Sequence, residues 1–424
     1  MEIGFILLGL LVVLIFLGIP IAFAIGIASL AAIVYGGLPI SILAQRSFAG
    51  IDSFPLLAVP FFLLAGNLMT AGGINERILR FCMALVGWIR GSLGIVTVVA
   101  SALFASISGS GVATVSSIGG ITIPAMKKNH YDPSFAAAVA SASSILGPLI
   151  PPSIFLIVYA NSVQMSVKDL FIGAVFPGIM VAIVFILYTY YYAKKHNIPS
   201  DEKLEGIRIL RESKNSFWAL LMPVIILGGI FGGIFTPTEA AAVSVVYAFI
   251  IGAFVYKEIK WKNLMTATME SCVSTAIILL LLATSNVSGW VVVASNLPAT
   301  ITEAFLSISG NAIVLFLLIN LLLLFVGMIL EANAAIVILV PILLPIVTAL
   351  GMTPLQFGIV MSVNLCIGLI TPPVGVCLLL GNDIAQTPFE KTFKRTMPFI
   401  LLAIAVLLLI TYVPFFTTWL PSVL

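Results

Sequence analysis

The chain has 424 residues, of which 61% are hydrophobic and only 8% charged, with a formal net charge of +3 and a mean hydropathy of +1.23. A soluble domain carries about 25% charged residues, so this composition excludes a water-soluble globular protein and indicates that the bilayer is its solvent. Because the apolar runs are long and continuous, we expect an all-α integral membrane protein and not a barrel, and the small net charge does not indicate a nucleic-acid partner.

The apolar segments define the expected membrane-spanning elements. In chain order they are 3–18, 20–36, 54–71, 91–126, 134–161, 168–192, 217–235, 237–256, 267–293, 311–350, 356–382 and 397–420. A spanning helix needs about 20 residues, so the first two segments are either two short tilted helices or one long kinked helix. The start of the chain lacks the basic residues of a signal peptide. The polar stretch 193–215 is expected to be an amphipathic cytoplasmic linker.

Two of these segments are too long for a single crossing. Small and polar residues at 106–111 interrupt segment 91–126, and those at 327–333 interrupt segment 311–350. Each reads as a re-entrant helical hairpin with its tip near the middle of the membrane, where irregular backbone is tolerated only inside protein or beside a cavity. For the first segment, two full crossings joined by a small-residue turn are the alternative.

The two halves of the chain share a register of 221 residues. This offset relates Pro151-Pro152 to Pro372-Pro373, and also pairs Gly147 with Gly368, Asn161 with Asn382, Ser141 with Ser362, Pro133 with Pro354 and Pro124 with Pro345. An internal repeat of this kind is typical of transporter folds.

The loop charges indicate that the repeat is inverted. The loop after the first hairpin carries Lys127 and Lys128 and is therefore expected inside, whereas its counterpart at 348–353 carries no charge and is expected outside. The other loops fit only if each hairpin returns to the side from which it started: 193–215, 257–263 and 383–396 are basic, and 296–310 is not. Arg46, in a loop that this topology places outside, is the exception.

Each half also contains a helix that is broken by a Pro-Pro pair. A proline removes its own N–H and clashes with the carbonyl four residues earlier, so the carbonyls of residues 147, 148, 368 and 369 are expected to be freed. Freed carbonyls suit a hard cation such as Na⁺, and each hairpin tip is expected to meet the break of its own half. The expected Na⁺ ligands are Ser106, Ser108, Gly109, Gly111, Gly147, Pro148, Gly327, Glu331, Asn333, Gly368, Leu369 and Thr371.

Half-helices that start near residues 112, 153, 334 and 374 would point the positive ends of their dipoles inward, where an anionic solute could bind. The expected solute-binding residues are Ser108, Ser110, Thr114, Ser153, Asn333 and Thr371. The alternative is that these small residues only permit close helix packing. Of the acids in apolar surroundings, Glu331 is expected to be functional and Glu239 to be a helix cap.

The sequence predicts no enzyme and no catalytic residue. Both histidines, His130 and His196, lie in loop-like stretches, and there is neither an HExxH motif nor a glycine-rich phosphate loop. The four cysteines form no CxxC pair and are expected to be packing residues.

Segment 49–69, with the sequence AGIDSFPLLAVPFFLLAGNLM, resembles the large membrane (permease) subunit of tripartite ATP-independent periplasmic (TRAP) transporters. Matching stretches at 108–114, 147–153, 235–242 and 371–375 extend the resemblance over essentially the whole chain. The resemblance implies a bacterial inner-membrane protein that works with a small four-helix membrane subunit and a periplasmic substrate-binding protein. It implies Na⁺-driven import of a carboxylate-bearing organic acid, such as a C4-dicarboxylate, a sialic acid or a sugar acid.

An elevator motion is also implied by this resemblance, and it gives the expected domains. Residues 1–90 and 162–310 are scaffold and arms, 91–161 and 311–382 are the two halves of a moving transport domain, and 383–424 is a C-terminal helix. A stand-alone Na⁺/dicarboxylate or citrate symporter and a passive channel are the alternatives.

Overall fold

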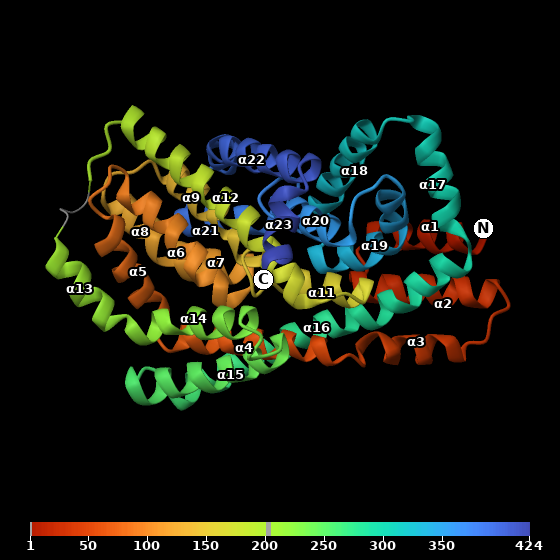
Figure 1. Ribbon diagram of the computed structural model, residues 1–424, viewed down its shortest axis with the longest axis horizontal. Helices are drawn as coiled ribbons and strands as arrows, with labels where there is room; N and C mark the ends of the chain where they lie inside the picture. Colours follow the sequence, from red (N-terminus) through yellow and green to blue (C-terminus); the bar gives the residue numbers. More distant parts are fainter. Residues whose placement is uncertain (1, 201–204) are drawn as a thin grey trace.

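The computed structural model describes residues 2–200 and 205–424, and all regular structure in these ranges is helical (Figure 1). The first range contains α1 (Glu2–Phe16), α2 (Ile21–Tyr35), α3 (Ser41–Ile51), η1 (Phe54–Leu57), α4 (Ala58–Ala71), α5 (Ile74–Val86), α6 (Ser92–Ser108), α7 (Gly111–Thr114), η2 (Val115–Gly119), α8 (Gly120–Lys128), α9 (Pro133–Ser144), α10 (Leu146–Leu149), α11 (Ile154–Val163) and α12 (Val167–Lys195). The second contains α13 (Gly206–Asn215), α14 (Phe217–Phe231), α15 (Pro237–Ile250), η3 (Ile251–Val255), α16 (Trp261–Ala294), α17 (Leu297–Ile308), α18 (Ala312–Gly327), α19 (Ala332–Ala349), α20 (Pro354–Gly368), α21 (Val376–Ala385), α22 (Phe389–Tyr412) and α23 (Phe415–Val423). The turns η2 and η3 are π-helical and continue α7 and α15.

Several of these helices can cross a membrane. Seven helical segments in the described ranges are long and apolar enough to do so, and there are eight if α13 and α14, which bend by 68° at Ser216, count as one span. Shorter apolar helices, including α6, α18 and α21, flank the expected tips and breaks. The expectation of an all-α, multi-pass membrane protein is therefore confirmed.

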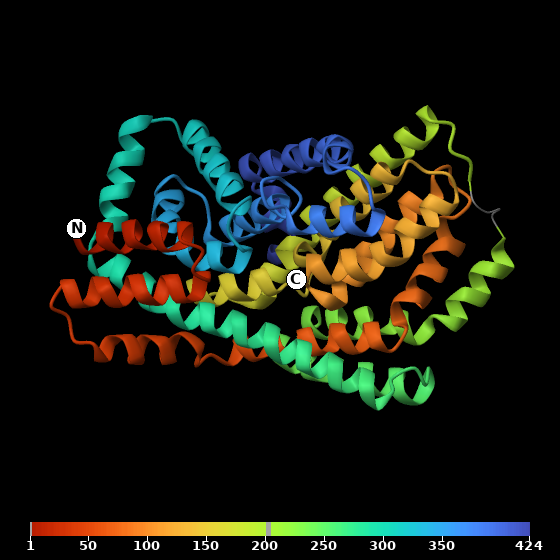
Figure 2. The same cartoon turned by 180° about the vertical axis from the view of Figure 1, so that it is seen from behind.

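The first two apolar segments form two separate helices. The helix α1 ends at Phe16, the chain turns, and α2 starts at Ile21 and packs beside α1, as the two red helices of Figure 2 show. One long kinked helix is therefore excluded.

A long helix borders the N-terminal helices. The helix α16 has 34 residues and packs along α2, α3 and α4 and against α19. In Figure 2 it is the teal helix that runs past the red helices of the N-terminal part. It thus joins the N-terminal helices to the second hairpin-bearing half.

The segment α9 to α11 forms the centre of the molecule. In its most apolar window 94% of the residues are buried, against 39–61% in the other candidate spans. The helix α9 consists largely of Ala and Ser and packs against α6, α21 and α22, which come from both halves. Small side chains allow such close helix contacts in a membrane protein.

The register of 221 residues recurs in the structure. Asp132 caps α9 ahead of Pro133, and Thr353 caps α20 ahead of Pro354. Each of these helices leads to an irregular break that contains a cis Pro-Pro bond, after which a second helix, α11 or α21, begins. The halves thus contain matching helix–break–helix units.

The helices α3, α5 and α17 lie in stretches that the apolar pattern predicts to be connections. The helix α5 buries Ile74, Ile78 and Cys82 on one face and carries polar residues on the other. A search for continuous apolar runs misses such a helix, because only every third or fourth residue faces the protein. In the expected linker 193–215, α12 reaches Lys195 and α13 starts at Gly206; residues 201–204 lie outside the described residues.

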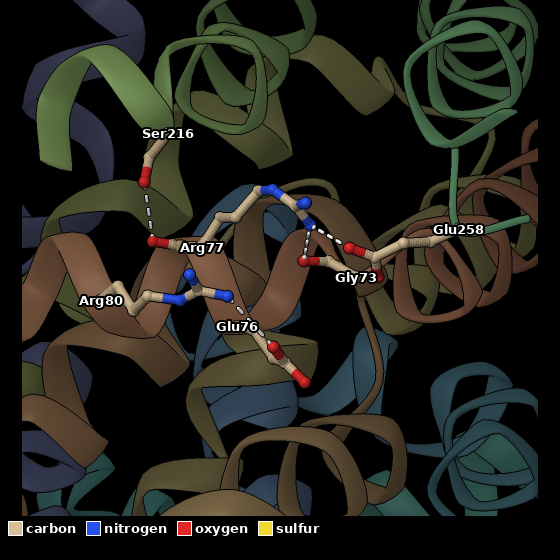
Figure 3. A network of polar contacts seen from close by, with 6 residues as sticks. All are labelled: Gly73, Glu76, Arg77, Arg80, Ser216 and Glu258. Carbon is tan, nitrogen blue, oxygen red and sulfur yellow. Dashed lines mark hydrogen bonds and ion pairs between the residues drawn. The ribbon is translucent and has the colours of Figure 1, made fainter. Parts of the chain in front are cut away.

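Arg77 links the starts of three helices through its side chain and its backbone carbonyl (Figure 3). Its guanidinium donates to the carbonyl oxygen of Gly73 at 2.8 Å and pairs with the carboxylate of Glu258 at 2.8 Å, while lying over the ring of Tyr256. Its own carbonyl accepts a hydrogen bond of 2.8 Å from Ser216, at the bend between α13 and α14. The starts of α5, α14 and α16 are therefore tied together.

Candidate solute and cation site

A cavity of about 630 Å³ lies where the two expected hairpin tips approach one another. It is lined by the first tip (Gly109, Ser110, Gly111, Val112), the second tip (Gly327, Met328, Ile329, Leu330, Glu331, Asn333), the second break (Gly368, Leu369, Val374, Gly375, Val376), the start of α11 (Ile154, Phe155) and residues of α2, α4 and α16 (Ile21, Leu63, Ser274, Ile277, Ile278, Leu281). In Figure 1 the helices of the first expected hairpin, α6 to α8, lie at the left of the molecule and those of the second, α18 and α19, at the right. This size suits a small organic solute.

The first tip reverses the chain between α6 and α8, which pack against each other. Gly109 ends α6 with a φ of +59°, a conformation that an L side chain rarely adopts. Ser110 caps the next helix by accepting the N–H of Ala113 at 3.4 Å, and its carbonyl accepts the hydroxyl of Thr114 at 2.7 Å. The tip is therefore an ordered turn and not a loose loop.

The first break lies directly behind this tip. A Cβ atom on Gly147 would lie 2.5 Å from the carbonyl oxygen of Ser110, so only glycine permits this approach. Ser153 caps α11 by accepting the N–H of Leu156 at 3.3 Å, and its hydroxyl donates to the carbonyl of Pro148. The expected meeting of tip and break within the first half is thus observed.

The second tip carries the acid of the site. Glu331 caps α19 by accepting the N–H of Ala334 at 3.0 Å, and it accepts the side-chain amide of Asn333 at 2.8 Å. The amide oxygen of Asn333 is buried and has no hydrogen-bond partner in the described part of the chain. A buried oxygen without a partner is costly, so this amide oxygen is available to accept a hydrogen bond or to coordinate a cation.

The second break meets the second tip in the same way. A Cβ atom on Gly368 would overlap the carbonyl oxygen of Gly327, and the N–H of Val374 donates to the carbonyl of Met328 at 3.4 Å. The first tip also reaches this break, because a Cβ atom on Gly111 would lie 3.3 Å from the side chain of Leu369. The two halves therefore interlock around the cavity.

The expected free carbonyls are mostly not free. The carbonyl of Pro148 accepts the hydroxyl of Ser153, that of Gly368 accepts the N–H of Thr371 at 3.1 Å, and that of Leu369 accepts the N–H of Cys377 at 3.0 Å. Sequence reasoning missed these donors because the chain folds back on itself after each proline pair. A carbonyl oxygen has two lone pairs, so each can still accept a second partner.

The structure divides the expected site residues into two groups. Those that line the cavity are Gly109, Ser110, Gly111, Gly327, Glu331, Asn333, Gly368 and Leu369. Those that lie buried behind the lining are Ser106, Ser108, Thr114, Gly147, Pro148, Ser153 and Thr371. In the second group, the hydroxyls of Ser106, Thr114 and Thr371 donate to backbone carbonyls within their own helix turns.

The side of the lining opposite the tips was not expected from the sequence. It is supplied mainly by α16, through Ser274, Ile277, Ile278 and Leu281. Nothing in the apolar run of α16 marks these positions, because their role depends on where the hairpin tips lie. Ser274 is the one polar side chain among them.

The charge of the lining is a single carboxylate. Within the described ranges Glu331 is the only ionisable residue that lines the cavity, and no cluster of three or more His, Cys, Asp or Glu side chains suited to a metal ion is found. A solute anion in this cavity would therefore meet backbone N–H groups, hydroxyls and any bound cation.

Glu239, the other acid considered from the sequence, is a helix cap. Thr236 accepts the N–H of Glu239 at 3.2 Å, and the carboxylate of Glu239 accepts the N–H of Thr236 at 2.8 Å. This reciprocal pair is a capping box at the start of α15, so the interpretation as a cap is confirmed.

Comparison with known proteins gives matches over nearly the full chain. The family model described as "Tripartite ATP-independent periplasmic transporter, DctM component" matches residues 8–416. An isethionate TRAP transporter permease protein, DctMQ, of Oleidesulfovibrio alaskensis is 42% identical over 96% of this chain, which spans 65% of that relative's length. The sialic acid TRAP transporter large permease protein SiaM of Vibrio cholerae is 40% identical, with 96% of each chain covered. Among solved structures, the YdaH transporter of Alcanivorax borkumensis aligns with a TM-score of 0.64 at 15% identity, covering 87% of each chain, and supports the fold alone.

Proposed function

Because this chain belongs to the family of DctM components, the large permease subunits of tripartite ATP-independent periplasmic transporters, we propose that it imports a small organic anion across the bacterial inner membrane by Na⁺-coupled transport. The observation that carries the proposal is the meeting of both hairpin tips and the second broken helix in one cavity. Broken helices and tips of this kind place helix ends and irregular backbone where solute and coupling ion bind.

The second half offers the better-defined cation site. The carboxylate of Glu331, the unpartnered amide oxygen of Asn333 and the carbonyl of Gly327 beside Gly368 form an oxygen-rich surface at the cavity. Oxygen ligands suit a hard cation such as Na⁺. The first half would supply a second site around Ser110 and Gly147.

The solute would bind through its anionic group. The helices after Ser110, Glu331 and Gly375 start at the cavity, and their first N–H groups and dipoles favour negative charge. Relatives are named for isethionate and for sialic acid. Since isethionate is a sulfonate, the proposed class is a small organic anion with a carboxylate or a sulfonate, C4-dicarboxylates included.

Transport would proceed by an elevator motion. Segments 91–161 and 311–382 carry both tips and both breaks, pack on one another and would move together. The scaffold, including α4 and α16, forms the opposite wall of the cavity. Partners would be a small four-helix membrane subunit and a periplasmic substrate-binding protein that delivers the solute.

The test is uptake into liposomes that contain this chain and its small partner subunit, with the binding protein outside. Labelled N-acetylneuraminate, succinate and isethionate are offered with and without an inward Na⁺ gradient. Uptake that needs both Na⁺ and the binding protein supports the proposal. Uptake without the binding protein favours a stand-alone symporter, and Na⁺-independent uptake without counterflow favours a channel.

A further inference from the structure

A second cavity, of about 410 Å³, lies between the scaffold and the hairpin-bearing helices and shares no lining residue with the first. It is lined by α3 (Arg46, Gly50), α11 (Asn161, Ser162), α16 (Leu282, Ser285, Asn286, Gly289, Trp290, Val293) and α19 (Val337, Val340, Pro341, Leu344, Pro345). Within the described ranges, Arg46 is the only charged residue in this lining. We propose that this second cavity is a binding site for an oxyanion, with Arg46 as its principal ligand.

The two cavities lie along the same helices. On α16 the first cavity includes Leu281 and the second Leu282, and on α19 the linings are separated by one turn, from Asn333 to Val337. The second cavity lies toward the ends of α11 and α19, which the loop charges place outside. An anion that enters from the outside would thus reach Arg46 before it reaches the tips.

Arg46 is free to bind such an anion. Its guanidinium lies over the ring of Trp290, 5.6 Å from the ring centre, and no carboxylate or carbonyl partner is found for it in the described part of the chain. A guanidinium has five N–H donors that match a carboxylate, sulfonate or phosphate group. Arg46 is exposed, and its contact with the indole leaves these donors available.

The cavity also contains polar side chains beside Arg46. Ser285 is among the lining residues, but its hydroxyl is buried away from the cavity surface. The amides of Asn161 and Asn286 are in the same lining. A side-chain amide can donate N–H groups to an oxyanion that Arg46 holds, so these two residues extend the polar part of the lining.

This arrangement explains the exception in the loop charges. The positive-inside rule disfavours a basic residue such as Arg46 on the external side of the membrane. Such a residue is nevertheless expected where an anion must be drawn from water toward a membrane-embedded site. The oxyanion can come from the transported solute or from a lipid headgroup. The solute assignment rests on the proposed function; the anion site itself does not.

The test is equilibrium binding, measured without Na⁺. The complex of this chain with its small subunit is placed in nanodiscs of phosphatidylcholine in a choline buffer, and tryptophan fluorescence is followed during titration with succinate, N-acetylneuraminate or isethionate. We expect a saturable change that W290F removes. R46Q should raise the dissociation constant at least about tenfold, because a charge-assisted bidentate contact is lost, and R46K should fall between the two. The matched control is R90Q, since Arg90 is exposed and lines neither cavity.

A second arm assigns the source of the anion. In nanodiscs that also contain phosphatidylglycerol, occupation by a headgroup phosphate would weaken solute binding to the wild-type complex but not to R46Q. An effect of phosphatidylglycerol that depends on Arg46 supports a lipid ligand, and its absence supports the solute. The proposal is overturned if no ligand gives a saturable signal that depends on Trp290, or if R46Q binds like the wild type. If the anion site is overturned but uptake remains Na⁺-driven, the proposed function still stands. Na⁺-independent uptake would overturn the proposed function and leave the anion site untouched.

Discussion

At the scale of single residues, the site depends on how closely backbone can approach backbone. Gly147 faces the carbonyl of Ser110, and Gly368 faces that of Gly327, at distances that leave no room for a Cβ atom. The neighbouring atoms belong to the backbone of a tip, so they cannot move aside as the end of a flexible side chain can. The contact between tip and break therefore requires glycine in both halves.

We expect Gly368→Ala to push the second tip away from its break. Overpacking of this kind costs about 1–3 kcal/mol, and uptake should fall at least about tenfold because the cavity changes shape. Both are measured by thermal unfolding of the purified complex and by initial rates in liposomes. Gly228→Ala is the control, since a Cβ atom there meets nothing within 4 Å. Equal uptake by the two variants would contradict the role given to the tip–break contact.

Glu331 and Glu239 give a matched pair of acids, each of which caps a helix. Gln can still accept the capping hydrogen bond, so Glu331→Gln removes the charge and keeps much of the cap. If the carboxylate faces Na⁺, the half-saturating Na⁺ concentration should rise at least about tenfold, whereas Glu239→Gln should leave it unchanged. The measurement is the Na⁺ dependence of initial uptake rates. An unchanged Na⁺ dependence in Glu331→Gln would remove this residue from the cation site.

At the scale of helices, the contacts of Arg77 hold the starts of α5, α14 and α16 together. Arg77→Ala would remove the bonds to Gly73 and Glu258 and the contact with the ring of Tyr256. We expect a loss of about 1–3 kcal/mol and a lower melting temperature. Arg80→Ala is the control, because its pair with Glu76 is about 60% exposed on both sides and should contribute less than about 1 kcal/mol. Melting curves that coincide for the two variants would show that the contacts of Arg77 do not contribute to the stability of the protein.

The sequence predicts the helices that are apolar on all sides and the positions of the breaks. Segments 134–161 and 356–382 correspond to α9–α11 and α20–α21, because Pro-Pro pairs and continuous apolar runs are local signals. The helix α5 is missed because its apolar residues lie on one face only. The donors to the carbonyls of Pro148 and Leu369 are missed because they depend on how the chain folds back after each break. The scaffold wall from α16 is missed because it is a tertiary contact.

At the scale of the whole molecule, the elevator proposal requires the first tip to leave the scaffold. A Cβ atom on Gly66 of α4 would lie 3.5 Å from the Cβ atom of Ser108. This separation falls within the range of a disulfide, about 3.5–4.5 Å. In a Cys272→Ser background, which removes the exposed cysteine, we expect oxidation of the pair G66C and S108C to stop uptake and reduction to restore it.

The control for this cross-link lies inside the proposed moving body. A Cβ atom on Gly381 would lie 3.4 Å from that of Ser141, just below this range, and the two residues belong to segments 311–382 and 91–161. Oxidation of G381C with S141C should therefore leave uptake as it is in the reduced protein. Mass spectrometry establishes that each disulfide has formed. Undiminished uptake by fully oxidised G66C and S108C would show that the tip stays on α4 throughout the cycle.

The small side chains of α9 have a mechanical consequence. Buried Ala and Ser residues bring α9 close to α6 and α22 and also to α21, so this helix touches both halves of the repeat. Interiors packed at such density are hardly compressible. A displacement of α6 is then passed through α9 to α21 and α22 and is not absorbed by side chains that change rotamer. The centre of the molecule is thus built from its smallest residues, and a larger side chain at a buried position of α9 would strain the helices that pack against it.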